Sequence, residues 1–273
     1  MINIVCVKIG TKYDSSYANR LFEMCRSNIT TPFKFICYTD DNRDLHPEIT
    51  AIPYVDNNIK VIVFNKLYLL SDEFASLLPN TDPCVFFDLD MVIKSNIDAF
   101  IAKARSYDGA VRVINAVWKR YYKKDFGPPI FDHTINSSCM VWKPYKNNHI
   151  WKRFNDNKQY YQDVYHRGMD CFLYYECRIR GGLPEDMFYS YLLGIDRKVY
   201  RVISSPEDYQ KIRRSTPIVL FNGPTTDDDI QQFIESGYEK EYVNFAEFFY
   251  ASKEQRDALN KAIEDDFNQR LAK

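Results

Sequence analysis

The chain reads Val85-Phe86-Phe87-Asp88-Leu89-Asp90-Met91-Val92-Ile93, an apolar segment interrupted by two carboxylates. Side chains of a strand alternate between two faces, so a strand through this segment would place Asp88 and Asp90 on the same face. Two oxygen donors at the end of a buried strand suit a hard cation such as Mg²⁺ or Mn²⁺, which can in turn hold a diphosphate. Because carboxylates beside apolar residues need a partner that offsets their desolvation, we interpret the pair as a metal site.

The same spacing recurs at Asp227 and Asp229, so the spacing alone does not define a metal site. This second copy lies in the polar segment 225–229, after a Gly-Pro turn and before a predicted helix. Acidic residues in such a place cap the helix or stay solvated. The apolar setting distinguishes the first copy, and a purely structural role for Asp88 and Asp90 is the alternative.

Length and composition indicate a globular protein. A chain of 273 residues with 45% hydrophobic content can bury a substantial core in one large domain or two small ones. The formal net charge of -1 excludes a global positive field that would attract a polyanion such as nucleic acid.

Cysteine usage and the N-terminus bear on the compartment. The seven cysteines are scattered, mostly among apolar neighbours, without Cys-x-x-Cys pairs, so we expect buried reduced thiols. The segment 1–8 is too short for a signal peptide and lacks a basic leader. No segment approaches the length needed to cross a bilayer, so we expect a cytoplasmic protein.

Strand-like and helix-like segments alternate along the chain. We expect strands at 2–7, 33–38, 49–53, 84–87, 109–114 and 135–142, and helices at 16–28, 66–78 and 147–165. This alternation predicts an α/β fold with a mostly parallel sheet covered on both faces. Without internal repeats or a low-complexity linker, we predict a single domain 1–273 in three parts, 1–114, 115–245 and a C-terminal helix in 246–273.

Three polar clusters follow predicted strands, at 8–11, 39–41 and 88–90. In parallel α/β sheets, ligands bind beyond the carboxyl ends of the strands. The three clusters would therefore meet at one edge of the sheet.

Seven short motifs occur in a recognisable order along residues 2 to about 226, namely 8–11, 39–40, 65–68, 86–91, 135–138, 184–187 and 220–224. This series resembles the nucleotide-sugar glycosyltransferases of the GT-A fold, and most of all glycosyltransferase family eight and its relatives. The resemblance implies a Rossmann-related, mostly parallel mixed sheet flanked by helices, with an elaborated C-terminal half. It also implies cation dependence, a UDP-sugar donor and retention of the anomeric configuration.

The resemblance also assigns residues of the donor site. Asp88 would lie on the ribose and metal side, and Asp90 would coordinate the metal between the diphosphate oxygens. Lys66 would offset phosphate charge. Residues expected to border the base and ribose are Val7, Lys8, Gly10, Thr11, Thr39 and Asp40, and those expected to meet the donor sugar are Asn136 and Ser137. The first part, 1–114, would therefore bind the nucleotide, and the second, 115–245, the donor sugar and the acceptor.

Glu185 and Asp186 match the acidic position that faces the transferring sugar in these enzymes. A metal and a lysine can stabilise the departing diphosphate, and a carboxylate on the other side can stabilise an oxocarbenium-like centre or accept the acceptor proton. The alternative is that both acids belong to the first turn of a helix at 187–193, after Pro184.

One motif departs from the family pattern. Where the family usually has His-x-Gly as a third metal ligand, this chain has Asn222-Gly223-Pro224. Asn222 can ligate through its amide oxygen, more weakly than imidazole, or the motif can be a turn. The four histidines, at 46, 133, 149 and 166, offer no obvious replacement.

Two rival functions fit parts of the same pattern. The segment Asp88 to Val92 also matches haloacid-dehalogenase-like phosphohydrolases, in which Asp88 would be the nucleophile and Asp90 the acid/base, with Ser204 and Asp227-Asp228 downstream. That motif normally lies near the N-terminus. A binding module for a sugar or nucleotide without turnover is the second rival. For a transferase, the hydroxyl acceptor can be a glycan, a lipid-linked glycan, a protein or a modified nucleic acid, and the sequence leaves this class and the oligomeric state open.

Overall fold

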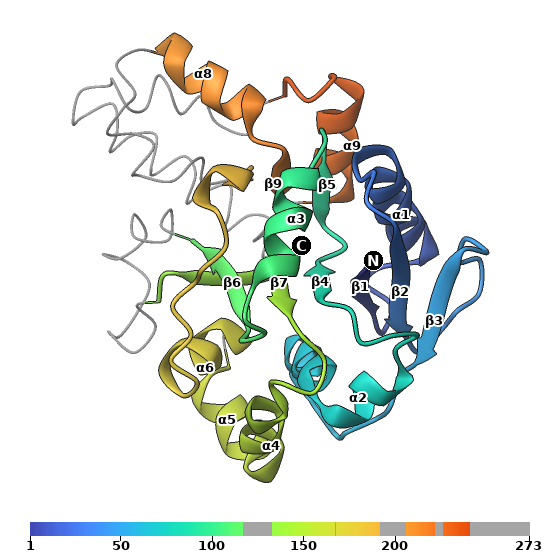
Figure 1. Ribbon diagram of the computed structural model, residues 1–273, viewed down its shortest axis with the longest axis vertical. Coiled ribbons are helices and arrows are strands. Elements are labelled where there is room, and N and C mark those ends of the chain that lie inside the picture. Colours follow the sequence, from blue (N-terminus) through green and yellow to red (C-terminus); the bar gives the residue numbers. More distant parts are fainter. Residues whose placement is uncertain (117–132, 167, 192–205, 222–225, 241–273) are drawn as a thin grey trace.

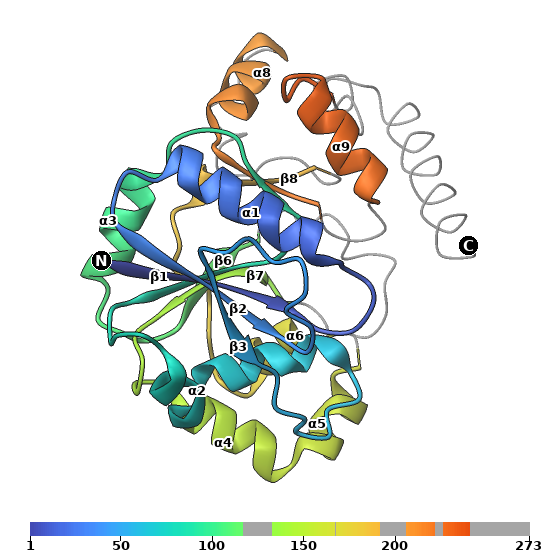
Figure 2. The same cartoon turned by 90° about the vertical axis from the view of Figure 1, so that its right-hand side faces the viewer.

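The protein has an α/β fold with a six-stranded sheet between two layers of helices (Figures 1 and 2). The structure is a computed structural model that describes residues 1–116, 133–166, 168–191, 206–221 and 226–240. The predicted class, a mostly parallel mixed sheet flanked by helices, is confirmed. The division of the chain into three parts stays a prediction, and the expected helix in 246–273 lies outside the described residues.

The large sheet has the strand order β3-β2-β1-β4-β7-β6. Its strands are β1 (Ile2–Lys8), β2 (Phe33–Thr39), β3 (Ile49–Pro53), β4 (Cys84–Phe87), β6 (Arg112–Asn115) and β7 (Ile135–Trp142). The first four are parallel, whereas β7 is antiparallel to both of its neighbours. The carboxyl ends of β1, β2, β4 and β6 therefore share one edge with the start of β7, as the polar clusters of the sequence predict for β1, β2 and β4.

A small second sheet follows directly from the large one. It has the order β5-β9-β8, from β5 (Met91–Ile93), β9 (Ile218–Leu220) and β8 (Phe188–Ser190). β5 is antiparallel to β9, and β8 is parallel to it. Only Asp88, Leu89 and Asp90 separate β4 from β5, so the chain crosses from one sheet to the other at this point.

Helices cover both faces of the large sheet, and two buried clusters form the core (Figure 2). One face packs against α1 (Ser15–Asn28) and α3 (Asp98–Ser106). The other face packs against the 3₁₀ helix η1 (Ile62–Leu70) and against α2 (Asp72–Leu77), α4 (Asn148–Asp156) and α6 (Met169–Tyr175), with α5 (Lys158–Val164) beside them. α1 is amphipathic, because its buried residues Ala18, Leu21, Phe22 and Cys25 recur at helical spacing.

The remaining elements surround the small sheet. A single 3₁₀ turn, η4 (Glu185–Met187), leads into β8, and α8 (Pro206–Ser215) leads into β9. α9 (Asp227–Glu235) follows, with Ile230 and Phe233 packed in a third buried cluster against Val92 and Phe221. Thr226 caps α9 in a capping box with Asp229, which confirms the helix-start interpretation of this second acidic segment.

Three helix predictions need correction. The helix expected over 66–78 is a 3₁₀ helix followed by α2, because the Ser71 side chain accepts a hydrogen bond from the Phe74 N–H and starts a new helix. The helix expected over 147–165 is divided at Asn157 into α4 and α5. The helix expected at 187–193 is wrong for residues 188–190, which are buried and pair with β9 as β8.

The cysteines and the helix lengths complete the description. All seven cysteines are free thiols, and six of them are buried. Within the described part of the chain, no helix has both the length and the apolar character needed to span a membrane.

Candidate functional site

The two central carboxylates lie in a turn. β4 ends at Phe87, and β5 begins at Met91, so Asp88 and Asp90 do not belong to a strand. The expectation that strand alternation places them on one face is therefore wrong. In this turn the two residues are still near enough for the charge of Asp90 to raise the pKa of Asp88.

Asp88 is held by the backbone of β7 and by Lys66. Its N–H donates to the Ser138 carbonyl at 2.8 Å, and Lys66 Nζ lies 2.5 Å from Asp88 Oδ1. The Lys66 and Asp88 side chains are 15% and 20% exposed. Burial, together with the charge of Asp90, raises the Asp88 pKa to about 6 and outweighs the opposing effect of Lys66. The pair of carboxylates therefore carries more negative charge than Lys66 offsets.

Asp90 is fixed from two other directions. The Tyr13 hydroxyl donates to Asp90 Oδ2 at 2.9 Å, and the Phe221 N–H donates to the Asp90 carbonyl at 3.0 Å. The pKa of Tyr13 is strongly raised by burial and then by the charge of Asp90. Asp90 thus connects the loop before α1 to the end of β9.

The donor set fits a hard divalent cation. Two carboxylates with one ammonium group leave a net negative charge in a mostly buried turn, and carboxylate oxygens are the ligands that Mg²⁺ and Mn²⁺ prefer. The described residues contain no group of three or more His, Cys, Asp or Glu side chains that could hold a metal. Asn222, the predicted third ligand, lies outside the described residues, so the structure describes only two of the three predicted metal ligands, Asp88 and Asp90.

The residues predicted to border the base and ribose lie at the ends of β1 and β2. Lys8 pairs in register with Thr39, directly after Val7 and Tyr38. The Gly10 N–H donates to Asp40 Oδ2 at 2.9 Å, and Gly10 has a φ of +75°, which favours glycine. Thr11 is exposed in the same loop. The structure therefore brings this group together at the edge that carries Asp88.

The predicted donor-sugar residues lie at the start of β7, on the same edge. Asn136 Oδ1 accepts a hydrogen bond from the Ser138 N–H at 2.9 Å, and Ser138 also binds the Asp88 N–H. The Ser137 N–H donates to Asp170 Oδ1 at 2.9 Å. These bonds connect the start of β7 to Asp88 on one side and to α6 on the other.

The two predicted catalytic acids differ in their surroundings. Asn115, at the carboxyl end of β6, donates from Nδ2 to Glu185 Oε1 at 2.5 Å. Because β6 ends at the same edge as β4, this bond places Glu185 at the edge that carries Asp88. Glu185 is partly buried, whereas Asp186 is exposed. Both lie in the short 3₁₀ turn η4, which leads directly into β8, so the alternative that they begin a helix at 187–193 is wrong.

Sequence reasoning missed Tyr13, Asn115 and Asp170. Tyr13 lies in the loop after β1, and Asn115 is the last residue of β6, so the carboxyl-end rule could have found both. Asp170 lies in the first turn of α6, and no motif connects it with Ser137.

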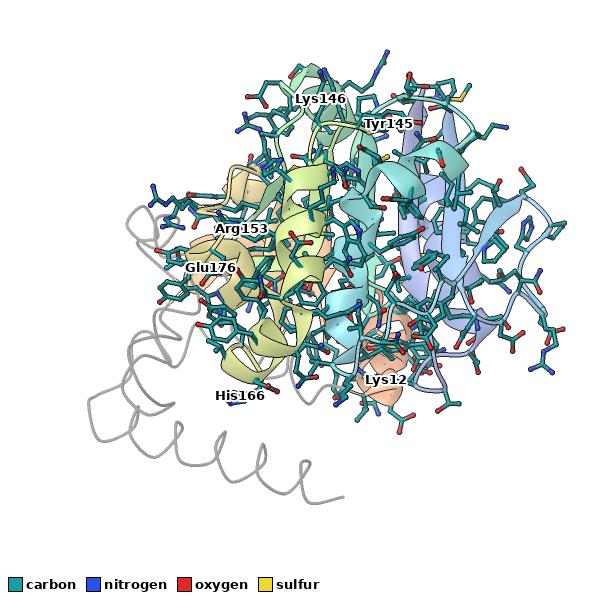
Figure 3. The ribbon with its side chains drawn as sticks, turned by 90° about the horizontal axis from the view of Figure 1, so that it is seen from below. Lys12, Tyr145, Lys146, Arg153, His166 and Glu176 are labelled. Carbon is teal, nitrogen blue, oxygen red and sulfur yellow. The ribbon has the colours of Figure 1, made fainter. Side chains whose placement is uncertain are left out.

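A cavity of about 290 Å³ lies elsewhere, between α4 and the end of α6. It is lined by His149, Ile150, Arg153, Glu176, Cys177 and Arg178, none of which is a predicted site residue. Figure 3 shows Arg153 and Glu176 close together and well separated from Lys12, which precedes Tyr13. We therefore assign the candidate functional site to the sheet edge and not to this cavity.

The chain is similar in structure to proteins of known structure. No family model matches the sequence, and a search of curated proteins finds no match. The structure is similar to a crystal structure of the galactosyltransferase LgtC in complex with donor and acceptor sugar analogues. The two chains are 14% identical, with a TM-score of 0.49, and the similarity covers 93% of this chain and 99% of LgtC.

Proposed function

We propose that the protein is a metal-dependent glycosyltransferase that moves a sugar from a nucleotide-sugar donor to a hydroxyl acceptor. The observation that supports this most is the turn between β4 and β5, in which Lys66 contacts Asp88 at 2.5 Å and Tyr13 contacts Asp90 at 2.9 Å. Ligands of α/β sheets bind beyond the carboxyl ends of the strands, where this turn lies. A UDP-sugar as the donor and retention of configuration are inherited from the family resemblance.

The reaction breaks the bond between the anomeric carbon and the diphosphate oxygen. A bound Mn²⁺ or Mg²⁺ would offset the charge on the departing diphosphate. Asp88 and Asp90 would hold that ion, and Lys66, already beside Asp88, would place a second positive charge near the phosphates. The net negative charge of the turn would then be compensated only with the cation in place.

The new bond joins the acceptor oxygen to the anomeric carbon, and the acceptor proton must leave. Glu185 is our candidate to accept this proton or to stabilise the positive charge on the sugar, because its bond from Asn115 fixes the carboxylate. Asp186 is the second candidate and is exposed. Asn136 and Ser137 would bind the donor sugar between these groups and Asp88.

The nucleoside would lie along the ends of β1 and β2. Asp40 accepts from the Gly10 N–H, and Lys8 and Thr39 lie side by side, so the loop after β1 is held beside the end of β2. Polar groups of this kind can orient a base and a ribose. Val7 and Thr11 complete the expected set.

The rival phosphohydrolase function lacks support in the described residues. Asp227, one of its required downstream acids, forms an ion pair with Arg20 at 3.0 Å and begins α9. Ser204 lies outside the described residues. A cytoplasmic location and the class of the acceptor stay predictions from the sequence.

Transfer by an Asp90→Ala variant tests the proposal. Wild-type protein with Mn²⁺ and a panel of UDP-sugars should release UDP and glycosylate a hydroxyl acceptor, and Asp90→Ala should abolish transfer without loss of folding. Asp228→Ala is the matched control, because Asp228 is an exposed residue of the second acidic segment. Unchanged transfer by Asp90→Ala would refute the assignment. Nucleotide binding by the wild type without any turnover would instead support a binding module.

A further inference from the structure

A line of contacts runs from Asp90 along α1 to α9. Tyr13, which donates to Asp90, packs edge-on against Tyr17 with ring centroids 4.8 Å apart. The Arg20 guanidinium lies 4.6 Å from the centroid of the Tyr17 ring. Arg20 Nη1 then contacts Asp227 Oδ1 at 3.0 Å. Tyr17 and Arg20 are three residues apart in α1, so they share one helix face.

This line meets both described ends of the segment 222–225. Phe221 precedes the segment, and its N–H donates to the Asp90 carbonyl at 3.0 Å. Asp227 follows the segment as the first residue of α9, after the Thr226 cap. One end is therefore bound to Asp90 directly, and the other through Arg20, Tyr17 and Tyr13.

We propose that Arg20 is a positioning residue of the candidate site. Through Asp227 and Tyr17, Arg20 fixes the start of α9 and the side chain of Tyr13, and so sets the placement of Asp90 and the affinity for the metal and nucleotide. It does so without contacting either ligand. This inference rests on the proposed function.

The surroundings of Arg20 argue against a role in stability alone. The Arg20 side chain is 20% exposed, and its Nε and Nη2 atoms are buried without a hydrogen-bond partner among the described residues. Asp227 is 48% exposed, so it can be solvated without Arg20. An ion pair of this kind contributes little to folding, because desolvation of the guanidinium opposes the attraction. The ion pair between Arg20 and Asp227 therefore matters more for the position of the groups that it connects than for the stability of the fold.

Calorimetric titration of UDP in the presence of Mn²⁺ tests the inference. Arg20→Met and Asp227→Asn should each weaken binding about threefold to fivefold, as expected for an ion pair worth up to about 1 kcal/mol. The double variant should lose less affinity than the sum of the two single variants, because both substitutions remove the contact between Arg20 and Asp227. Arg20→Lys should restore part of the affinity. Arg214→Met is the control, since it breaks an exposed ion pair with Glu239 at 3.1 Å, away from Asp90, and should bind like the wild type.

The outcomes separate this inference from the proposed function. If the wild type does not bind UDP with Mn²⁺, the proposed function fails. If the wild type binds but Arg20→Met and Asp227→Asn bind equally well, the positioning role is overturned while the function stands. The positioning role is also overturned if the loss of UDP affinity in the double variant equals the sum of the losses in the two single variants. Urea unfolding shows whether each variant is folded. If Arg20→Met does not fold, the single variants Asp227→Asn and Arg20→Lys test the positioning role instead.

Discussion

An Asp88→Asn variant should be more stable than the wild type when no metal is bound. Burial raises the Asp88 pKa from 3.8 to about 6 despite the nearby Lys66. Because the folded pKa lies above the unfolded value, stability falls as the pH rises through this window, and the loss is complete above it. Each pH unit corresponds to about 1.4 kcal/mol, so the ionised carboxylate costs up to about 3 kcal/mol at pH 8. The neutral amide avoids this cost.

Urea unfolding at pH 8 and pH 4 measures the effect. The Asn variant should gain up to about 3 kcal/mol at pH 8, where Asp88 is ionised, and almost nothing at pH 4, where it is protonated. With Mn²⁺ and UDP at a hundred times their dissociation constants, the wild type should gain about 2.7 kcal/mol, and the variant should not. Stability of the unliganded form and ligand binding would then change in opposite directions.

Asp98→Asn is the matched control for the sign of the effect. Hydrogen bonds from Asn96 and Thr30 lower the pKa of Asp98, so its ionised form is favoured by the fold. That substitution should lower stability at pH 8. A variant at Asp88 that is less stable than the wild type at pH 8 would refute the conclusion that the carboxylate is incompletely compensated.

Two other predictions concern a backbone conformation and a half-buried lysine. Gly10→Ala should lower the free energy of unfolding by about 1–2 kcal/mol, because Gly10 has a φ of +75°. It should also weaken UDP binding, because the loop of Gly10 contacts Asp40. Urea unfolding measures the first effect and calorimetric titration the second, and wild-type values in both would contradict the strain argument. Lys94 donates to the carbonyls of Arg213 and Arg214, and burial, followed by the charge of Arg213, lowers its pKa to about 8. Between pH 8 and 10.5 the unfolded state therefore binds more protons than the folded state. The stability of the wild type should then rise relative to that of Lys94→Met as the pH increases from 7.5 to 9.5. A constant difference between the urea midpoints of the two proteins over this range would disprove the prediction.

The sequence predicted the class of the fold well, because strand and helix periodicities alternate along its first half. The polar residues after β1, β2 and β4 were correctly placed at one edge by the geometry of parallel strands. The boundary between β4 and β5 was not predictable, because Met91-Val92-Ile93 is as apolar as the end of β4 and reads as its continuation. Only the pairing of β5 with β9, more than 120 residues later, reveals a second sheet.

Contacts of the site were harder to predict than its position. Tyr13 and Asp90 are 77 residues apart, and Asn115 and Glu185 are 70 apart, so no local pattern connects them. The pairing of Lys66 with Asp88 was expected only indirectly, through the phosphate role that the resemblance gives to Lys66. Helix boundaries failed where a side chain such as Ser71 starts a new helix within an apolar segment.

The crossing between the two sheets has a consequence for biosynthesis. Asp90 receives one contact from residue 13 and another from residue 221, so its surroundings are drawn from almost the whole described chain. During synthesis, Asp88 and Asp90 leave the ribosome long before β9 does. Distant pairings of this kind form slowly. The proposed metal site should therefore be complete only once synthesis has passed Phe221, and fragments that stop before β9 should not bind Mn²⁺.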